Sequence, residues 1–116
     1  MARILFALHD PPYGTERVYN GLRWALQMAK TDGEVRVFLF GDAVVSAVTG
    51  QTVPNGYYNT GKQTVALGRA GGVVGACSSC MDARGITDDR LLEGAHRSSM
   101  AELGEWTTWA DKVINV

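Results

Sequence analysis

This 116-residue sequence has little cysteine, little proline, no long apolar run and no excess of either charge. Its net charge is −1 and its 11 lysines and arginines are scattered singly, so neither nucleic acid nor an anionic membrane is expected as a partner. No apolar stretch approaches the roughly 20 residues that a membrane-spanning helix needs. We find no internal repeat, low-complexity tract or linker, and therefore expect a single domain over residues 1–116.

The start of the chain lacks the pattern of a secretory signal. The apolar run Ile4–Leu8 is shorter than the roughly 7–15 residues of a signal-peptide core, and His9-Asp10 closes it. We therefore expect a cytoplasmic protein. In that compartment the 2 cysteines are expected to be reduced and functional rather than joined in a permanent disulfide.

Short apolar runs alternate with helical patterns along the chain. Hydrophobic residues make up 46% of the sequence and charged residues 20%, which is the composition of a globular protein with a core. Such runs are typical of strands covered on both faces, and the helices between them indicate βαβ units. We therefore predict an α/β fold with a parallel sheet. The predicted strands are Ile4–Leu8, Val35–Phe40, Val73–Cys77 and Val113–Val116, with Ala95–Ser98 as a short additional strand.

Capping and turn residues place the helices. Thr15 is predicted to cap a first helix with Glu16 in its first turn, and Asp32-Gly33 is predicted to end it. Asp42 is predicted to cap a shorter helix that runs to about Thr49. The other predictions are a surface loop over Gly50–Asn59, a helix over Thr60–Arg69, a turn around Arg84-Gly85, a short helical turn capped by Thr87 or Asp88, and a last helix opened by the capping box Ser99–Glu102.

The segment Cys77-Ser78-Ser79-Cys80 is the one motif with a specific chemical interpretation. Cys77 ends a predicted buried strand, which is where open parallel sheets place their ligand crevices. A turn of small residues after it would let backbone N–H groups point back at the sulfur. Such donors, with Arg84 nearby, favour the thiolate and make Cys77 a nucleophile. The sulfur of Cys80 could then attack a mixed disulfide or a persulfide formed on Cys77.

Three other interpretations of the cysteine pair stay open. Cys77 could be a small core hydrophobe, since free cysteine is among the most buried residue types. A thioredoxin-like redox site would use a helix that starts within the CxxC motif and a proline late in the chain, but the prolines are Pro11, Pro12 and Pro54. A zinc site needs four ligands, and His9 and His96 are isolated from each other, so we expect neither a metal nor a cofactor.

The segment His9–Thr15 connects the first strand to the first helix. It lacks the glycine-rich dinucleotide fingerprint and a P-loop lysine, so an ordinary capped loop is the favoured interpretation. Under parallel topology, however, this loop and Cys77 follow strands at the same edge of the sheet. The loop is therefore predicted to form part of the wall of a pocket for the cysteine. The pocket candidates are His9, Tyr13, Gly14, Thr15 and Arg84.

Four segments together resemble the DsrE/DsrF-like family, and most closely its small YchN-like members. They are Pro12–Glu16, Val37–Val44, Cys77–Ile86 and Ser99–Val113, so that the resemblance runs from end to end. It implies a three-layer α/β/α sandwich with a Rossmann-like parallel sheet of about five strands, and assembly into homo-oligomers, often trimers or hexamers.

The resemblance also implies a role for Cys77. In the sulfur-relay branch of the family, one cysteine at a strand end carries sulfur as a persulfide, eight residues before the glycine of an Arg-Gly pair. Counted back from Gly85, that position is Cys77. Cys80 matches a second cysteine found in YchN-like chains, which the relay subunits need not have. Relay subunits also work with sulfur donor and acceptor proteins.

Large apolar residues beyond the predicted core stripes suggest subunit contacts, although a core that extends further around its helices would explain them equally well. They are Trp24, Met28, Trp109 and Tyr57-Tyr58. The leading functional hypothesis is a sulfur carrier or sulfurtransferase that holds sulfane sulfur on Cys77. The alternatives are a non-enzymatic oligomeric scaffold, a thiol redox-sensing or binding module, and a metal-binding module.

Overall fold

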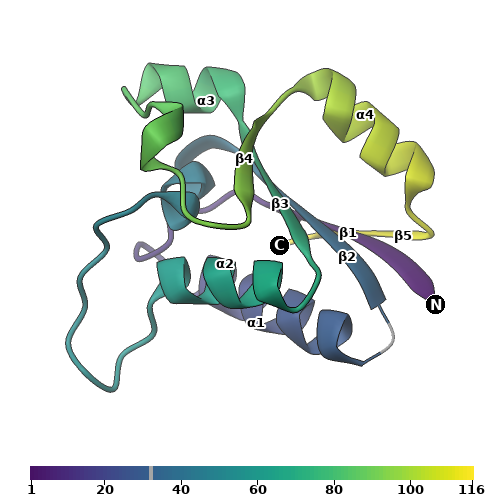
Figure 1. The fold of residues 1–116 in the computed structure, drawn as a ribbon, viewed down its shortest axis with the longest axis horizontal. Helices are drawn as coiled ribbons and strands as arrows, with labels where there is room; N and C mark the ends of the chain where they lie inside the picture. Colours follow the sequence, from purple (N-terminus) through teal and green to yellow (C-terminus); the bar gives the residue numbers. More distant parts are fainter. Residues whose placement is uncertain (32) are drawn as a thin grey trace.

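The computed structural model describes residues 1–31 and 33–116 and contains a five-stranded sheet (Figure 1). Its strand order is β4-β3-β2-β1-β5, and every pair of neighbouring strands is parallel. The predicted parallel α/β fold and all five predicted strands are therefore confirmed, including the short fourth one. The strands are β1 (Ala2–Leu8), β2 (Gly33–Leu39), β3 (Val73–Cys77), β4 (Ala95–Ser98) and β5 (Lys112–Asn115).

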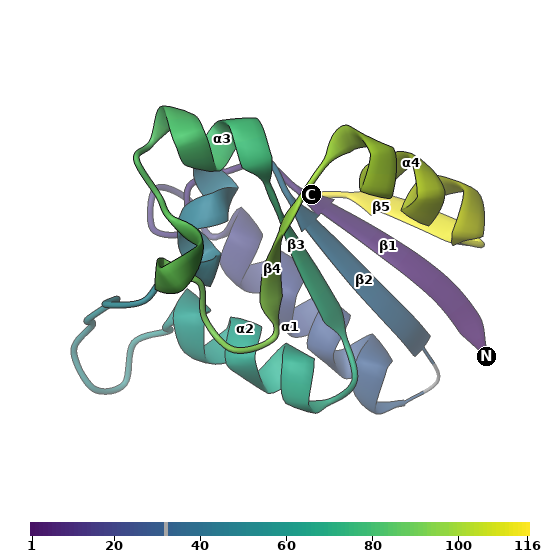
Figure 2. The same ribbon diagram turned by 45° about the horizontal axis from the view of Figure 1, so that its top comes forward.

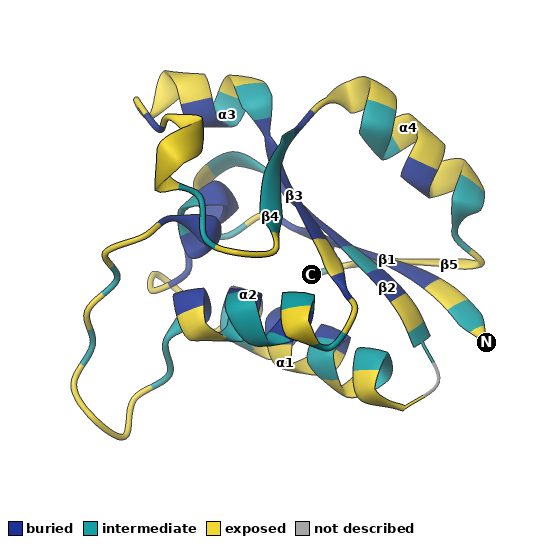
Figure 3. Ribbon diagram, viewed as in Figure 1, coloured by how far each residue is buried: buried dark blue, intermediate teal, exposed yellow. Residues whose placement is uncertain are grey.

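Helices cover the two faces of the sheet unequally. Helices α1 (Arg17–Lys30) and α2 (Thr60–Arg69) lie side by side on one face, and α4 (Met100–Trp109) lies on the other (Figure 2). Trp106 is the buried residue of α4, so this helix leaves most of its surface in solvent, as Figure 3 shows. Two short elements, the 3₁₀ helix η1 (Gly41–Ala47) and helix α3 (Ser78–Ala83), follow the carboxyl ends of β2 and β3.

The core lies around the three central strands. β1 buries every residue from Ile4 to Leu8, because helices cover it on both sides. On the α1 side, the ring of Trp24 packs edge-on against Phe6, with 5.5 Å between the ring centroids. On the α4 side, the ring of Trp106 packs against Phe38 in the same manner at 6.4 Å. Both halves of the sandwich are thus held by an aromatic pair that joins a helix to a strand.

Several predicted helix boundaries are wrong by one or two residues. The first helix begins at Arg17, with Glu16 in the N-cap position. Thr15 Oγ1 nevertheless accepts from the N–H of Arg17 at 3.3 Å, while its hydroxyl donates to the Asp10 carboxylate. The second predicted helix is the 3₁₀ helix η1, which begins before Asp42, and its last residue is Ala47. The first helix ends at Lys30 and Gly33 begins β2, whereas Asp32 of the predicted helix end lies outside the described residues.

The remaining boundaries agree better with the sequence. The N–H group of Glu102 donates to Ser99 Oγ at 3.1 Å, which confirms Ser99 as the cap of α4. The Glu102 carboxylate, however, does not complete the capping box, because it accepts from Ser98 Oγ at 2.6 Å. Helix α2 has the predicted bounds, the loop before it projects from the body of the molecule (Figure 1), and Thr87 is the N-cap residue of the 3₁₀ turn η2 (Asp88–Arg90).

Among the residues described, no helix is long and apolar enough to cross a membrane.

Candidate thiol site

Cys77 is the last residue of β3 and lies directly before the first residue of α3. Its relative exposure is 5%, and it packs against the core. The sequence-based expectation of a turn after Cys77 is wrong, because the chain enters a helix at Ser78 without an intervening loop. A helix that starts within the CxxC motif is the arrangement that a thioredoxin-like site uses, so this feature no longer separates the two interpretations.

Hydrogen-bond donors surround the Cys77 sulfur. The hydroxyl of Ser79 lies 3.4 Å from Cys77 Sγ, and Ser79 is itself exposed, so the sulfur lies one side chain below the surface. Burial raises the pKa of Cys77, but hydrogen bonds from the Cys80 thiol, the Ser79 hydroxyl and the backbone N–H groups of both residues lower it. The net result is a pKa below the ordinary value of a thiol. Cys77 therefore forms a thiolate more readily than an ordinary cysteine.

Cys80 has the opposite electrostatics. Burial raises the pKa of Cys80, and the hydrogen bond that its thiol donates to Cys77 raises it further. The backbone N–H of Gly41 donates to Cys80 Sγ at 3.2 Å and opposes part of this shift. Both cysteines are free thiols. Over the pH range between their two pKa values, the pair therefore consists of a protonated Cys80 beside an anionic Cys77.

Arg84 lies beside the pair without touching either sulfur in a hydrogen bond. Its guanidinium donates to Asp42 Oδ1 at 2.7 and 3.0 Å and to the carbonyl oxygen of Cys80 at 3.0 Å. These contacts tie α3 to η1. Because the Asp42 carboxylate neutralises the guanidinium, Arg84 contributes little net positive charge at Cys77. Of the predicted pocket candidates, Arg84 is the one that contacts the CxxC segment.

The other predicted pocket residues divide into two groups. His9 stacks on Phe40, with 4.8 Å between ring centroids, and therefore lies against the residue that precedes Gly41. The hydroxyl of Tyr13 instead donates to Gln51 at 2.6 Å, and Thr15 bonds to Asp10. Gly14 packs close to Pro11. The structure thus brings His9 towards the cysteine site and engages Tyr13, Gly14 and Thr15 elsewhere.

Sequence reasoning missed two groups at the site. Gly41 and Asp42 follow β2, and their signal was available, because neighbouring parallel strands end at the same edge of a sheet. Gly41 has a φ of +52°, a backbone conformation that glycine adopts without strain, and its N–H faces Cys80. The second group is Arg97, whose contacts with α3 are described below.

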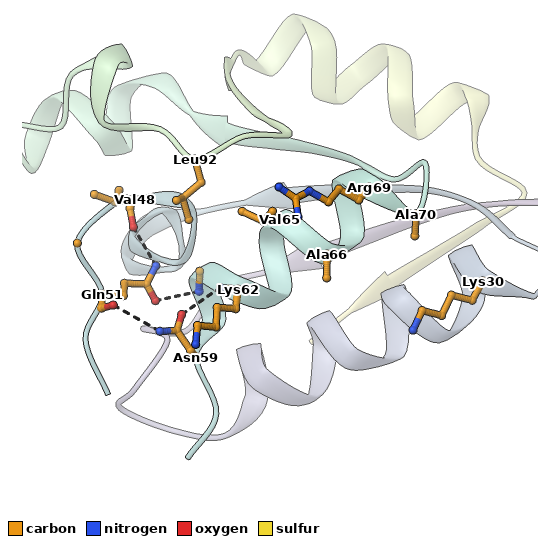
Figure 4. A pocket seen from close by; sticks show the side chains of 12 residues that line it. Lys30, Val48, Gln51, Asn59, Lys62, Val65, Ala66, Arg69, Ala70 and Leu92 are labelled. Carbon is orange, nitrogen blue, oxygen red and sulfur yellow. Dashed lines mark hydrogen bonds between the residues drawn. The ribbon is translucent and has the colours of Figure 1, made fainter. Parts of the chain in front are cut away.

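Two cavities lie away from the cysteines. One, of about 710 Å³, runs along the outer side of α2 between Val65, Ala66 and Leu92, with Lys62 and Arg69 at its rim (Figure 4). The other, of about 480 Å³, lies beside Tyr57 in the projecting loop. Within residues 1–31 and 33–116 no group of three or more His, Cys, Asp or Glu side chains is placed to hold a metal ion.

The fold and the site define a class of protein: a parallel α/β domain with a CxxC motif at the end of a central strand. The sequence pattern of the DsrE/DsrF-like family matches residues 2–116, so the chain belongs to that family, which is linked to sulfur relay. It is 34% identical to Protein YchN of Escherichia coli (strain K12) over 98% of each chain. It is also 35% identical to an uncharacterized protein of Methanopyrus kandleri over 96% of this chain and 91% of the other.

Solved structures support the same assignment. The crystal structure of the E. coli ychN protein superposes with a TM-score of 0.92 at 33% identity, and covers all of both chains. The fold is therefore of the DsrE type, as the resemblance implied. A structure from Methanobacterium thermoautotrophicum has a TM-score of 0.77 at 19% identity over both whole chains and supports the fold alone.

Proposed function

We propose that this chain, as a single DsrE-like domain over residues 1–116, carries sulfane sulfur as a persulfide on Cys77. The observation that supports the proposal most is the set of donors around the Cys77 sulfur, which lowers the pKa of that thiol despite its burial. A thiolate is the form of cysteine that attacks sulfur. Membership of a family linked to sulfur relay points to the same chemistry.

The loading step is a thiolate attack on a persulfide donor. The Cys77 thiolate attacks the outer sulfur of the donor, the S–S bond of the donor breaks, and the donor leaves as a thiolate. The new S–S bond leaves a persulfide on Cys77. No electrons are gained or lost overall, so the step needs no oxidant or cofactor. Transfer to an acceptor nucleophile is the same reaction in reverse and restores the Cys77 thiolate.

Cys80 offers a second route of release. After losing its proton, its sulfur attacks the inner sulfur of the Cys77 persulfide, forms a Cys77–Cys80 disulfide and expels hydrosulfide. An external dithiol then reduces the disulfide. Cys77 directly precedes α3 and Cys80 lies in the first turn of that helix, so the two sulfurs belong to one short segment of the chain. A cytoplasmic location, where such dithiols keep cysteines reduced, fits this cycle.

Intact-mass spectrometry after incubation with a low-molecular-weight persulfide donor tests the proposal. The wild type is expected to gain sulfur, Cys77→Ala to gain none, and Cys80→Ala to gain sulfur but to lose the disulfide that follows release. A wild-type protein that acquires no sulfur, under conditions in which both thiols are shown to be reduced, would contradict the proposal.

A second candidate is a homo-oligomeric scaffold or binding module, which the apolar cavity along α2 and the exposed ring of Tyr57, 71% accessible, favour. Trp24 packs on Phe6 but is 48% accessible, so it too is a candidate contact residue. The guanidinium of Arg36 covers the ring of Trp109 at 3.9 Å. The scaffold hypothesis predicts that a variant with both cysteines changed to serine keeps its assembly and its cellular activity. Loss of cellular activity with intact assembly would reject it.

A further inference from the structure

Arg97 reaches from the edge strand β4 to the residue that follows Cys77. Its backbone pairs with Ala76 of β3, next to the strand end. Its Nη1 donates to Ser78 Oγ at 2.7 Å and contacts the carbonyl oxygen of the same residue at 3.3 Å. A charged guanidinium therefore holds both the side chain and the backbone of the first residue of α3.

The same guanidinium also holds the far side of α3. Nη1 donates to Asp82 Oδ1 at 2.9 Å, Nε to Asp88 Oδ1 at 2.5 Å, and Nη2 to the carbonyl oxygen of Ile86 at 3.4 Å. Arg97 thus joins the start of the helix, its last turn and the chain beyond it. Only arginine offers donors in several directions from one planar group, so lysine cannot reproduce the set.

Helix α3 depends on such an anchor. It has six residues, which is far below the roughly 12–15 that an isolated helix needs in water, and Met81 is its buried residue. The side chain of its N-cap residue, Cys77, makes no capping hydrogen bond. Local sequence therefore does not determine where the helix begins, and contacts from outside it must.

We propose that Arg97 is a positioning residue for the thiol site: its hold on Ser78 sets the start of α3 and so the place of the next residue, Ser79, whose hydroxyl lies 3.4 Å from the Cys77 sulfur. The Ser79 hydroxyl is one of the hydrogen-bond donors that lower the pKa of Cys77. A change in the path of Ser78 moves this donor. The biological meaning of this inference rests on the proposed function, whereas the contacts of Arg97 are independent of that function.

The test measures the rate of Cys77 alkylation by iodoacetamide against pH, with the modified peptide quantified by mass spectrometry. In Arg97→Gln the pH midpoint of Cys77 alkylation is expected to rise by about one unit, with little change in the limiting rate at high pH. At neutral pH the alkylation is then roughly tenfold slower. Arg97→Lys is expected to show the same shift, because the lysine ammonium lacks the planar set of donors that the guanidinium offers. Arg69→Gln removes an exposed Arg–Glu93 pair and is the matched control, with no shift expected.

A lower melting temperature with an unchanged midpoint in Arg97→Gln would overturn the inference, because a purely structural anchor moves only the former. If that variant does not fold, Ser78→Ala removes the 2.7 Å contact alone and must still raise the midpoint. In the double variant the two shifts should be less than additive, since they act through one contact. Alkylation needs no sulfur donor. A shifted midpoint in a protein that takes up no sulfur would therefore reject the proposed function and leave the inference standing.

Discussion

The Cys77 sulfur belongs to a mostly buried residue whose pKa is nevertheless lowered. Burial alone would raise the pKa of the thiol, and the donated hydrogen bonds outweigh that effect. Since the folded-state pKa of Cys77 lies below its unfolded value, the thiolate stabilises the fold above the unfolded pKa. That contribution is lost as the pH falls through the folded pKa. The folded-state pKa of Cys80 lies above its unfolded value, so the protonated thiol stabilises the fold below the unfolded pKa. That contribution is lost as the pH rises through the folded pKa.

The Ser79 hydroxyl is the donor that mutation can remove with least disturbance, because Ser79 is exposed. Ser79→Ala is expected to raise the pKa of Cys77 by roughly half a unit to one unit, because a net hydrogen bond contributes about 0.5–1.5 kcal/mol and one unit corresponds to about 1.4 kcal/mol. The pH dependence of thiolate absorbance or of alkylation measures it. Ser79→Thr keeps the hydroxyl and is expected to behave as the wild type. Equal pKa values in all three proteins would show that the hydroxyl does not donate.

At the scale of elements, the approach of α4 to the sheet depends on Gly75 in β3. A Cβ atom on Gly75 would lie 3.0 Å from the Trp106 ring and 3.0 Å from Ser98 Cβ. The absence of a side chain at Gly75 therefore serves packing. Trp106 is the buried residue of α4, so this close contact fixes how the helix lies on the sheet.

Gly75→Val is expected to destabilise the protein by about 1–3 kcal/mol through overpacking against Trp106. Gly104, within α4, is the control: nothing lies within 4 Å of a Cβ there. Gly104→Ala is expected to stabilise by about 0.5–1 kcal/mol because alanine favours a helix. Urea unfolding of both variants measures the two changes. A Gly75→Val protein as stable as the wild type would show that α4 is free to move away from the sheet.

Elements whose signal is local were predictable, and those set by distant contacts were not. Apolar runs predicted four of the five strands, and the place of Cys77 at a strand end followed from them. The exception is β4 (Ala95–Ser98), which has no such run. Helix α3 was missed because Ser78-Ser79-Cys80 has no helical signal, and Arg97, which is distant in sequence, holds it. The contact of the Gly41 N–H with Cys80 spans 39 positions of the chain, so the shared edge of the parallel sheet was the one sequence signal for it.

At the scale of the whole molecule, parallel topology gathers the site. The residues after β2 and β3 meet at one sheet edge, where Gly41 and Asp42 contact Cys80 and Arg84. One face of the sheet carries the lightly packed α4 (Figure 3). We propose that a second copy of the chain covers this face.

Light scattering coupled to size exclusion is expected to give three or six times the mass of one chain, because we propose a trimer or hexamer. The mass should not change in the variant with both cysteines replaced by serine, since thiols that carry sulfur are not needed for assembly. A monomer at micromolar concentration would contradict the assembly proposal and leave the thiol chemistry untouched.

Competitive alkylation of the two cysteines at pH 7 tests the central claim most directly. The wild-type protein is treated with less than one equivalent of iodoacetamide, and the Cys77 and Cys80 positions are resolved by fragmentation. We predict that Cys77 is modified first although Cys80 is the more exposed residue, because the pKa of Cys77 is lowered and that of Cys80 is raised. Modification of Cys80 first, with Cys77 reacting only on unfolding, would show that Cys77 is a core residue and would contradict the account.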